Sequence, residues 1–181
     1  MGWKDVEKTE SAKIPYTKFN EGSTVIRVLD DEPYSFWQHW IGTAKTAATC
    51  RGKDCPICNV IAQDKANRVT PRFSNSQRHA MRIWNYATNE MEIMIQGRKF
   101  MNQLLTLNRE VGDLKTYDVK VIRSGSGTDT TYSVLPMAES EFEHSEDCYT
   151  VDMADQFKAP AREDMLQLMD GRTWSEINQA S

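Results

Sequence analysis

The chain has 181 residues and carries 22 Lys and Arg against 26 Asp and Glu, so its formal net charge is -4. This length accommodates one domain of ordinary size with extensions, and a hydrophobic core that needs no disulfide staples. No apolar run approaches the ~20 residues that a membrane helix needs, and the N-terminus lacks the apolar segment of a secretory signal. We therefore expect a soluble, intracellular protein with reduced thiols, which favours metal binding over disulfides.

Charge is distributed unevenly along the chain. Residues 1–137 hold 19 Lys and Arg against 15 Asp and Glu, whereas residues 138–181 hold 3 against 11. A basic body indicates a polyanionic partner, and an acidic end indicates a solvated or self-competing tail. We accordingly expect three parts, namely a loose N-terminal arm over residues 1–23, a core over residues 24–137 and an acidic C-terminal tail over residues 138–181.

Short strands dominate the predicted core, because apolar and β-branched residues alternate between turn residues. In chain order, the predicted strands are Thr24–Leu29, Tyr34–Ile41, Ala80–Ala87, residues 91–95, Tyr117–Arg123 and Thr130–Pro136. An apolar stripe predicts one helix at Gly97–Leu107, and the tail holds a possible short helix at Arg162–Met169. This order predicts a mainly β fold, an OB-type barrel of five to six short strands with one helix and an inserted zinc knuckle, with a β-sandwich as the alternative.

The segment from His39 to Cys58 has the spacing of a metal site, H-x10-C-x4-C-x2-C. Three thiolates and one imidazole suit tetrahedral Zn²⁺, and the C-x2-C pair lets both sulfurs reach one ion. We predict His39, Cys50, Cys55 and Cys58 as ligands within an insertion at about residues 39–61. Four protein ligands leave no open coordination position, so the predicted zinc is structural.

The identity of the fourth ligand stays open at this point. His79 is a serious rival to His39, because it follows the predicted loop at residues 70–77 and could fold back. His144 is a weaker candidate, and Cys148 has no neighbouring cysteine and is expected to be a bystander.

Zinc enzymes need residues that this chain lacks. Nucleobase deaminases pair H-x-E with a separate P-C-x-x-C, but His39 is followed by Trp40 and Ile41. The metalloprotease pattern H-E-x-x-H is absent too, as are a Walker loop and G-x-S-x-G. We expect no enzymatic activity, and a zinc-dependent nuclease or deaminase is the weakest of the alternatives.

Basic and aromatic residues gather around the predicted metal segment. Residues 45–82 hold eight Lys and Arg and two acidic residues. Single-stranded nucleic acid binds where cations follow the phosphates and rings stack on bases. Alternation predicts that Arg82, Trp84 and Tyr86 share a face, which Arg27 extends. The predicted DNA-binding residues are Arg27, Trp37, Trp40, Lys45, Arg51, Lys53, Arg72, Phe73, Arg78, Arg82, Trp84, Tyr86 and Lys120.

Together these features resemble the phage single-stranded DNA-binding proteins of the T-even helix-destabilising type. The matching features are His39, Cys50, Cys55, Cys58, the strands Thr24–Leu29 and Tyr34–Ile41, and the acidic tail from Glu139. The resemblance covers roughly residues 20–137 as architecture and implies an OB fold with a zinc subdomain of one His and three Cys. The spacing between Cys50 and Cys55 is shorter than in the T-even proteins, and the N-terminal arm lacks their compact basic cluster.

The resemblance implies a protein that coats and protects exposed single-stranded DNA during phage DNA replication, recombination and repair, with largely sequence-independent binding. It also implies self-association on DNA, contacts between the acidic tail and replication or recombination proteins, and work in the cytoplasm of an infected bacterial host. The alternative is a zinc-ribbon protein-interaction adaptor without nucleic-acid binding. An adaptor would hold zinc and be indifferent to oligonucleotides.

Overall fold

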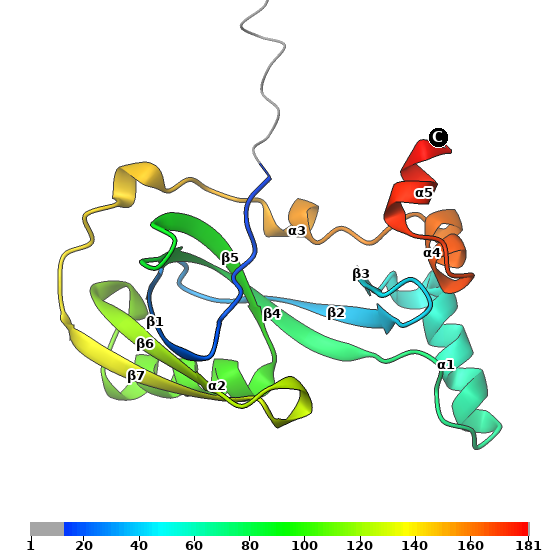
Figure 1. Ribbon diagram of the computed structural model, residues 1–181, viewed down its shortest axis with the longest axis horizontal. Helices are drawn as coiled ribbons and strands as arrows, with labels where there is room; N and C mark the ends of the chain where they lie inside the picture. The colour runs from blue at the N-terminus through cyan, green and yellow to red at the C-terminus, as the bar shows by residue number, and fades with distance from the viewer. Residues whose placement is uncertain (1–12, 181) are drawn as a thin grey trace, which may run out of the picture. The chain divides into compact units, whose positions relative to one another are not determined.

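The computed structural model of the protein describes residues 13–180, which form seven strands and five α-helices (Figure 1). The strands are β1 (Gly22–Val28), β2 (Tyr34–Ile41), β3 (Thr46–Thr49), β4 (Ser76–Asn85), β5 (Glu90–Gln96), β6 (Tyr117–Ser124) and β7 (Thr131–Glu139). The α-helices are α1 (Pro56–Ala66), α2 (Arg98–Glu110), α3 (Met153–Gln156), α4 (Arg162–Met169) and α5 (Trp174–Gln179), and short 3₁₀ turns lie at Gly52–Asp54, Leu114–Thr116, Gly127–Asp129 and Ser145–Asp147. Between residues 13 and 180, no helix combines the length and the apolar character that crossing a bilayer requires.

The prediction of a mainly β fold is confirmed. The strands form one antiparallel sheet in the order β3-β2-β4-β1-β6-β7, and β5 pairs with β4 beside this path. The described strands β3 and β7 are the edges of this order, so the sheet stays open where we expected a partly closed barrel or a two-sheet sandwich. Pro136 lies in β7, and an edge strand tolerates proline because one side of it makes no ladder hydrogen bonds.

Two of the predicted elements have the bounds expected from the sequence, namely β2 and α4. Strand β4 begins four residues before the predicted Ala80, because residues from Ser76 to His79 pair with β2. The structure adds β3, α1, α3 and α5 to the predicted elements.

The chain divides into two compact units, which we describe separately. The sheet unit contains the described residues up to Glu32, Met81–Ile95 and Asn102–Tyr149. The cysteine unit contains Pro33–Ala80, Gln96–Met101 and the described residues from Thr150 onward. Strand β4 contributes its first half to the cysteine unit and its second half to the sheet unit. The predicted arm lies mainly outside the described residues, and the segment expected as one acidic tail supplies residues to both units.

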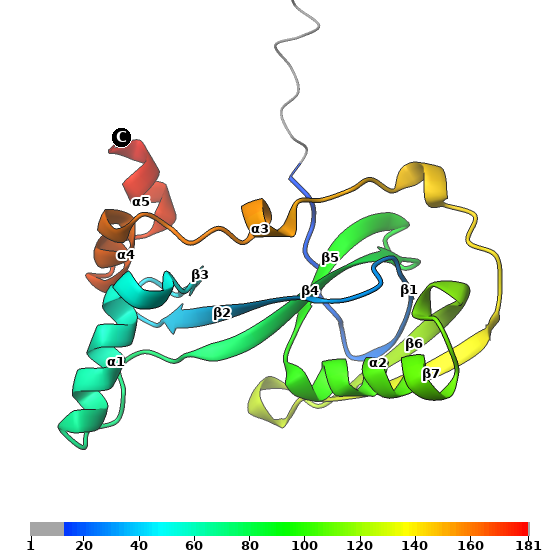
Figure 2. The same ribbon diagram turned by 180° about the vertical axis from the view of Figure 1, so that it is seen from behind.

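In the sheet unit, β6 buries alternate residues, as period-2 patterning requires, whereas β1 also buries the intervening Arg27. In β1, Ile26 and Val28 are fully buried, and in β6 Val119 and Val121 are buried too. Helix α2 covers this sheet beside β7 (Figure 2), where the Gln103 side chain donates to the carbonyl of Tyr132 and accepts from the backbone of Val134.

The cysteine unit has a core of its own, built from segments far apart in the sequence. Its buried residues are Ile41, Ala44, Ala48, Cys55, Ile57, Ile61, Phe73, Met165, Leu168 and Ile177. Helix α4 packs beside α1 (Figure 1), and the Thr43 hydroxyl donates to the carbonyls of Leu168 and Met169. Residues near the C-terminus are therefore part of the core around the cysteines and do not form a free tail.

Two leucines in one turn of α4 test this packing. Leu168 is fully buried, whereas Leu166 is 41% exposed. We expect Leu168→Ala to lower the free energy of unfolding by about 2–5 kcal/mol, because it leaves a cavity in the core of the cysteine unit. The matched control Leu166→Ala should change it by no more than about 0.5 kcal/mol. Urea unfolding followed by circular dichroism measures both, and equal small effects would contradict the packing of α4.

Candidate metal centre

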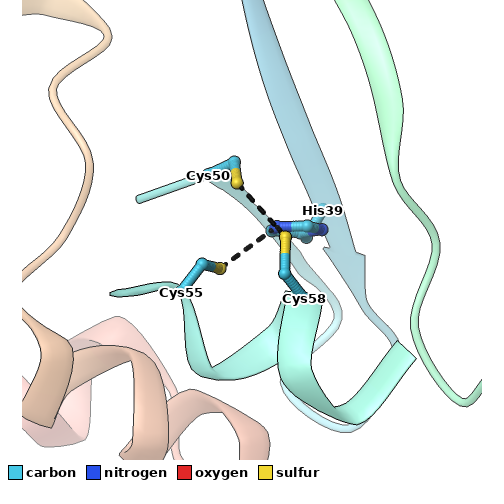
Figure 3. A group of neighbouring side chains, drawn as sticks. All are labelled: His39, Cys50, Cys55 and Cys58. Atoms are coloured by element: carbon cyan, nitrogen blue, oxygen red, sulfur yellow. Dashed lines mark hydrogen bonds between the residues drawn. The ribbon is translucent and has the colours of Figure 1, made fainter. Parts of the chain in front are cut away.

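Four side chains of the cysteine unit converge on one point (Figure 3). The ligand atoms of His39, Cys50, Cys55 and Cys58 all lie within 4.8 Å of one another. The sulfurs of Cys50 and Cys58 are 3.5 Å apart, and the Nε2 atom of His39 lies 3.3 Å from the sulfur of Cys55 and 3.6 Å from that of Cys58. Sulfurs bound to one tetrahedral Zn²⁺ at ~2.3 Å would be about 3.7 Å apart, so this cluster fits a four-coordinate ion.

Local backbone geometry explains why the C-x2-C pair points to one place. Cys55 is the N-cap of α1 and Cys58 lies three residues on, with Pro56 at the first helical position. Side chains at these two positions both lie over the first turn of a helix, as in a capping box. The pair therefore presents two sulfurs at the positive end of the α1 dipole.

Cys50 reaches the same point from the end of β3. Its backbone N–H donates to the carbonyl of Trp37 at 2.8 Å, which ties it to β2 two residues before His39. Its sulfur accepts a hydrogen bond from the backbone N–H of Gly52 at 3.3 Å. Gly52 has a φ of 79°, a left-handed conformation that favours glycine and turns the chain back toward Cys55.

The protonation of His39 suits a metal ligand. Its Nδ1 atom lies 3.0 Å from the carbonyl oxygen of Ser74, so Nδ1–H donates there and leaves Nε2 facing the three sulfurs with its lone pair. Burial lowers the pKa of His39, an effect that the hydrogen bond to Ser74 partly offsets. The ring is therefore neutral at physiological pH, which is the form that binds metals.

The three thiols can all ionise only if a cation lies between them. Burial, the hydrogen bond with Cys50 and the nearby charges of Cys55 and Cys50 raise the pKa of Cys58 to about 12. At Cys55, burial opposes ionisation, but hydrogen bonds from the backbone of Cys58, Arg51 and Ile57 outweigh it, and the net pKa is lowered. Three thiolates this close repel one another unless a positive ion lies between them.

The residues that surround these ligands were not predicted from the sequence. The Cys55 sulfur lies 3.7 Å from the sulfur of Met165 in α4. Arg51 donates to the carbonyl of Pro160, and Arg162 donates to the carbonyl of Asp54. The apolar pattern at residues 162–169 predicted a helix, but the sequence carries no signal for which surface that helix covers.

The structure brings His39, not His79, to the cysteines. His79 hydrogen-bonds through its Nδ1 atom to the hydroxyl of Ser35 at 2.7 Å. His144 and Cys148 both lie in the sheet unit, where the Cys148 thiol donates to the carbonyl of His144. The cluster of possible ligands found among the described residues includes none of these three side chains.

The predicted DNA-binding residues fall into three exposure classes. Trp37 and Trp40 are 51% and 52% exposed, and Lys45, Lys53 and Arg72 are exposed as well. The partly buried residues are Arg51, Arg78, Arg82, Tyr86 and Lys120, and the buried ones are Arg27, Phe73 and Trp84. Arg72 pairs with Asp64, and Arg51 pairs with Asp54.

Three of the residues predicted to share a face, Arg27, Trp84 and Tyr86, lie close together in the sheet unit. Arg27 pairs with Trp84 in the register of β1 and β4, and side chains paired in this way lie on one face of a sheet. Asp118 accepts from the Nε atom of Arg27 at 2.7 Å and from the Tyr86 hydroxyl at 3.0 Å. Burial and this hydrogen bond raise the pKa of Tyr86 to about 12.

Residues 140–149, here called the strap, lie over this face. The ring of His144 stacks on Trp84 with centroids 4.4 Å apart and planes 9° apart. Arg27 donates to the hydroxyl of Ser140 at 2.7 Å, and its guanidinium lies 5.6 Å from the ring centroid of Phe142. With the strap in place, Trp84 is 2% exposed. The acidic segment is therefore packed on the face that was predicted to hold DNA.

Comparisons of the chain with protein-family models, with curated proteins and with solved structures gave no match.

Cys58→Ser tests the metal centre, with Cys148→Ser as its control. We expect one bound ion per chain in the unmodified protein, because the four ligand atoms are already within reach of one another. Cys58→Ser should weaken metal affinity by more than the about 10–100-fold that loss of an outer-shell contact costs. Cys148→Ser removes a thiol that lies outside the cluster and should leave the metal content unchanged. Competition with a chromophoric chelator measures both affinities, and unchanged metal binding by Cys58→Ser would exclude this site.

Proposed function

We propose that the protein binds single-stranded DNA with little sequence preference, and that a structural Zn²⁺ ion braces the unit carrying its exposed tryptophans. In this proposal phosphates contact Lys and Arg, and bases stack on aromatic rings. The resemblance noted from the sequence extends the proposal to coating and protecting exposed DNA during phage replication, recombination and repair. Acidic residues of the strap, including Glu141 and Glu143, would then be contacts for replication or recombination proteins.

The main support for the proposal is the stacking of the His144 ring on Trp84. His144 presents a planar heterocycle to the indole at a stacking distance, with an arginine on the same face of the sheet. A nucleobase offers the same π-surface, and its phosphate would offer Arg27 the acceptors that Ser140 now provides. The face therefore has the chemistry of a base-stacking platform and already holds an occupant of comparable shape.

Zinc is the ion that the donor set favours. Thiolate and imidazole ligands in a three-to-one ratio suit a borderline-soft ion with tetrahedral geometry, and Mg²⁺ and Ca²⁺ prefer oxygen. With four protein ligands, the ion would hold β2, β3 and α1 together and add to the free energy of folding.

The strap supports an intramolecular competition for the platform. Its own charge is negative, its His144 ring lies where a base would stack, and its Ser140 occupies Arg27. DNA would therefore have to displace it before reaching Trp84. Removing all residues after 137 would not test this competition cleanly, because Met165, Leu168 and Ile177 belong to the core of the cysteine unit.

Titration of the tryptophan fluorescence with dT oligomers of about thirty nucleotides tests the proposed function. We expect binding whose affinity falls steeply between about 50 and 200 mM salt, because each phosphate contact releases counterions. A duplex of the same length serves as the control and should bind more weakly. Absence of any response to the oligomers, with metal bound, would favour a protein-interaction adaptor.

Substitutions in the strap test the competition. Phe142→Ala combined with His144→Ala removes the rings that cover Trp84 and Arg27, so affinity for dT oligomers should rise by about three- to tenfold, the equivalent of about one lost stacking contact. Glu143→Gln removes a strap charge but no ring contact and should have a smaller effect. Fluorescence anisotropy at fixed salt measures both, and unchanged or weaker binding by the double variant would contradict the competition.

A further inference from the structure

One face of the β2–β4 pairing in the cysteine unit carries a ring and polar groups that the metal does not use. Ser35 and Trp37 of β2 pair with His79 and Gln77 of β4, so these four side chains share one face. The hydrogen bond between the Ser35 hydroxyl and the Nδ1 atom of His79 agrees with this arrangement. Trp37 is 51% exposed within it.

Positive charge acts on His79. The charges of Arg98 and Arg78 are, after burial, the causes of its lowered pKa. Arg78 is the neighbour of His79 in β4, so its side chain leaves the opposite face of the strand, and a guanidinium nitrogen lies 3.3 Å from the position that a Cβ would take at Gly97, beside the start of α2. Arg98 is the first residue of α2, and Lys99 follows it.

This placement of charge is unfavourable for the free protein. The first turn of α2 has no acidic residue and begins with two cations, where the helix dipole favours anions. None of these three cations makes an ion pair within residues 13–180, although five other Lys or Arg residues there do. The buried Nε atom of Arg78 also has no hydrogen-bond partner in the described part of the chain. An anion at this place would offset the first two deficits, but it could not reach the buried Nε atom of Arg78.

We propose that Trp37, His79 and Arg98, here called the Trp37 patch, form a contact for one base and the adjoining phosphates of single-stranded DNA. This inference rests on the proposed function and adds a location to it. The Trp37 ring would stack on the base, and the cations near the start of α2 would receive the phosphates. Unlike Trp84, Trp37 is open to solvent, so the patch is available before the strap has moved.

The surroundings of Trp37 favour nucleic acid over a protein partner. The centre of a protein interface is depleted of charge and apolar, whereas this ring lies among polar side chains and cations. An exposed indole near unpaired cations is instead the combination that binds single strands without reading their sequence.

The test compares two pairs of variants by anisotropy with dT oligomers. Trp37→Ala should weaken binding about tenfold through lost stacking, and the control Val69→Ala should have little effect. Val69 is an equally exposed apolar residue of the cysteine unit and is not among the predicted DNA-binding residues. Arg98→Glu should weaken binding and reduce the slope of log affinity against log salt by about one.

Lys65→Glu, at an exposed position of α1, makes the same change in net charge and should leave that slope nearly unaltered. Arg98→Glu places an acid at a helix N-terminus, so the melting temperature should not fall. A readout independent of affinity is the His79 ring, whose pKa, followed by NMR, should rise when dT oligomers bring phosphates beside it.

The outcomes separate the two proposals. Weaker binding by Trp37→Ala and Arg98→Glu, with near-normal binding by both controls, supports the Trp37 patch. Normal binding by all four variants overturns the patch and leaves the proposed function standing. Failure of the unmodified, metal-loaded protein to bind the oligomers overturns the proposed function and the patch with it.

Discussion

The convergence of four ligand atoms from three chain segments is the constraint on which the cysteine unit depends. His39 comes from β2, Cys50 follows β3, and the remaining pair begins α1. Three thiolates this close repel one another unless a cation lies between them. A bound ion would fix β2 and hold Cys55 against Met165 of α4. It would therefore stabilise β2, the turn that carries the cysteines and α4 together.

The tryptophans of the two units differ in their exposure to solvent. In the sheet unit, the strap holds Trp84 beneath His144 and Arg27 beneath Ser140. In the cysteine unit, Trp37 is open, and its backbone carbonyl accepts the hydrogen bond that positions Cys50. Metal binding and the position of Trp37 are therefore linked through β2. In the proposed function, Trp37 can contact DNA while the strap is in place, whereas Trp84 becomes accessible only after the strap has been displaced.

Features that depend on neighbouring residues could be predicted from the sequence. The cysteine spacing predicted the three sulfur ligands, and the aromatic-rich run after Pro33 predicted β2, because both signals depend on neighbouring residues. Helix α1 was missed because its residues were interpreted as part of a metal loop and bury only Pro56, Ile57, Ile61 and Asp64. The charge of the acidic end predicted a solvated or self-competing tail, but it did not predict which rings of the strap pack against residues about sixty positions earlier, because no local pattern encodes that contact.

X-ray absorption spectroscopy of the purified protein is the sharpest test of the metal centre, because it reports the ion and its ligands together. We predict a zinc edge and a first shell of three sulfurs at ~2.3 Å and one nitrogen at ~2.0–2.1 Å. A shell dominated by oxygen, or a protein that stays folded and metal-free with a disulfide between Cys50 and Cys58, would contradict it.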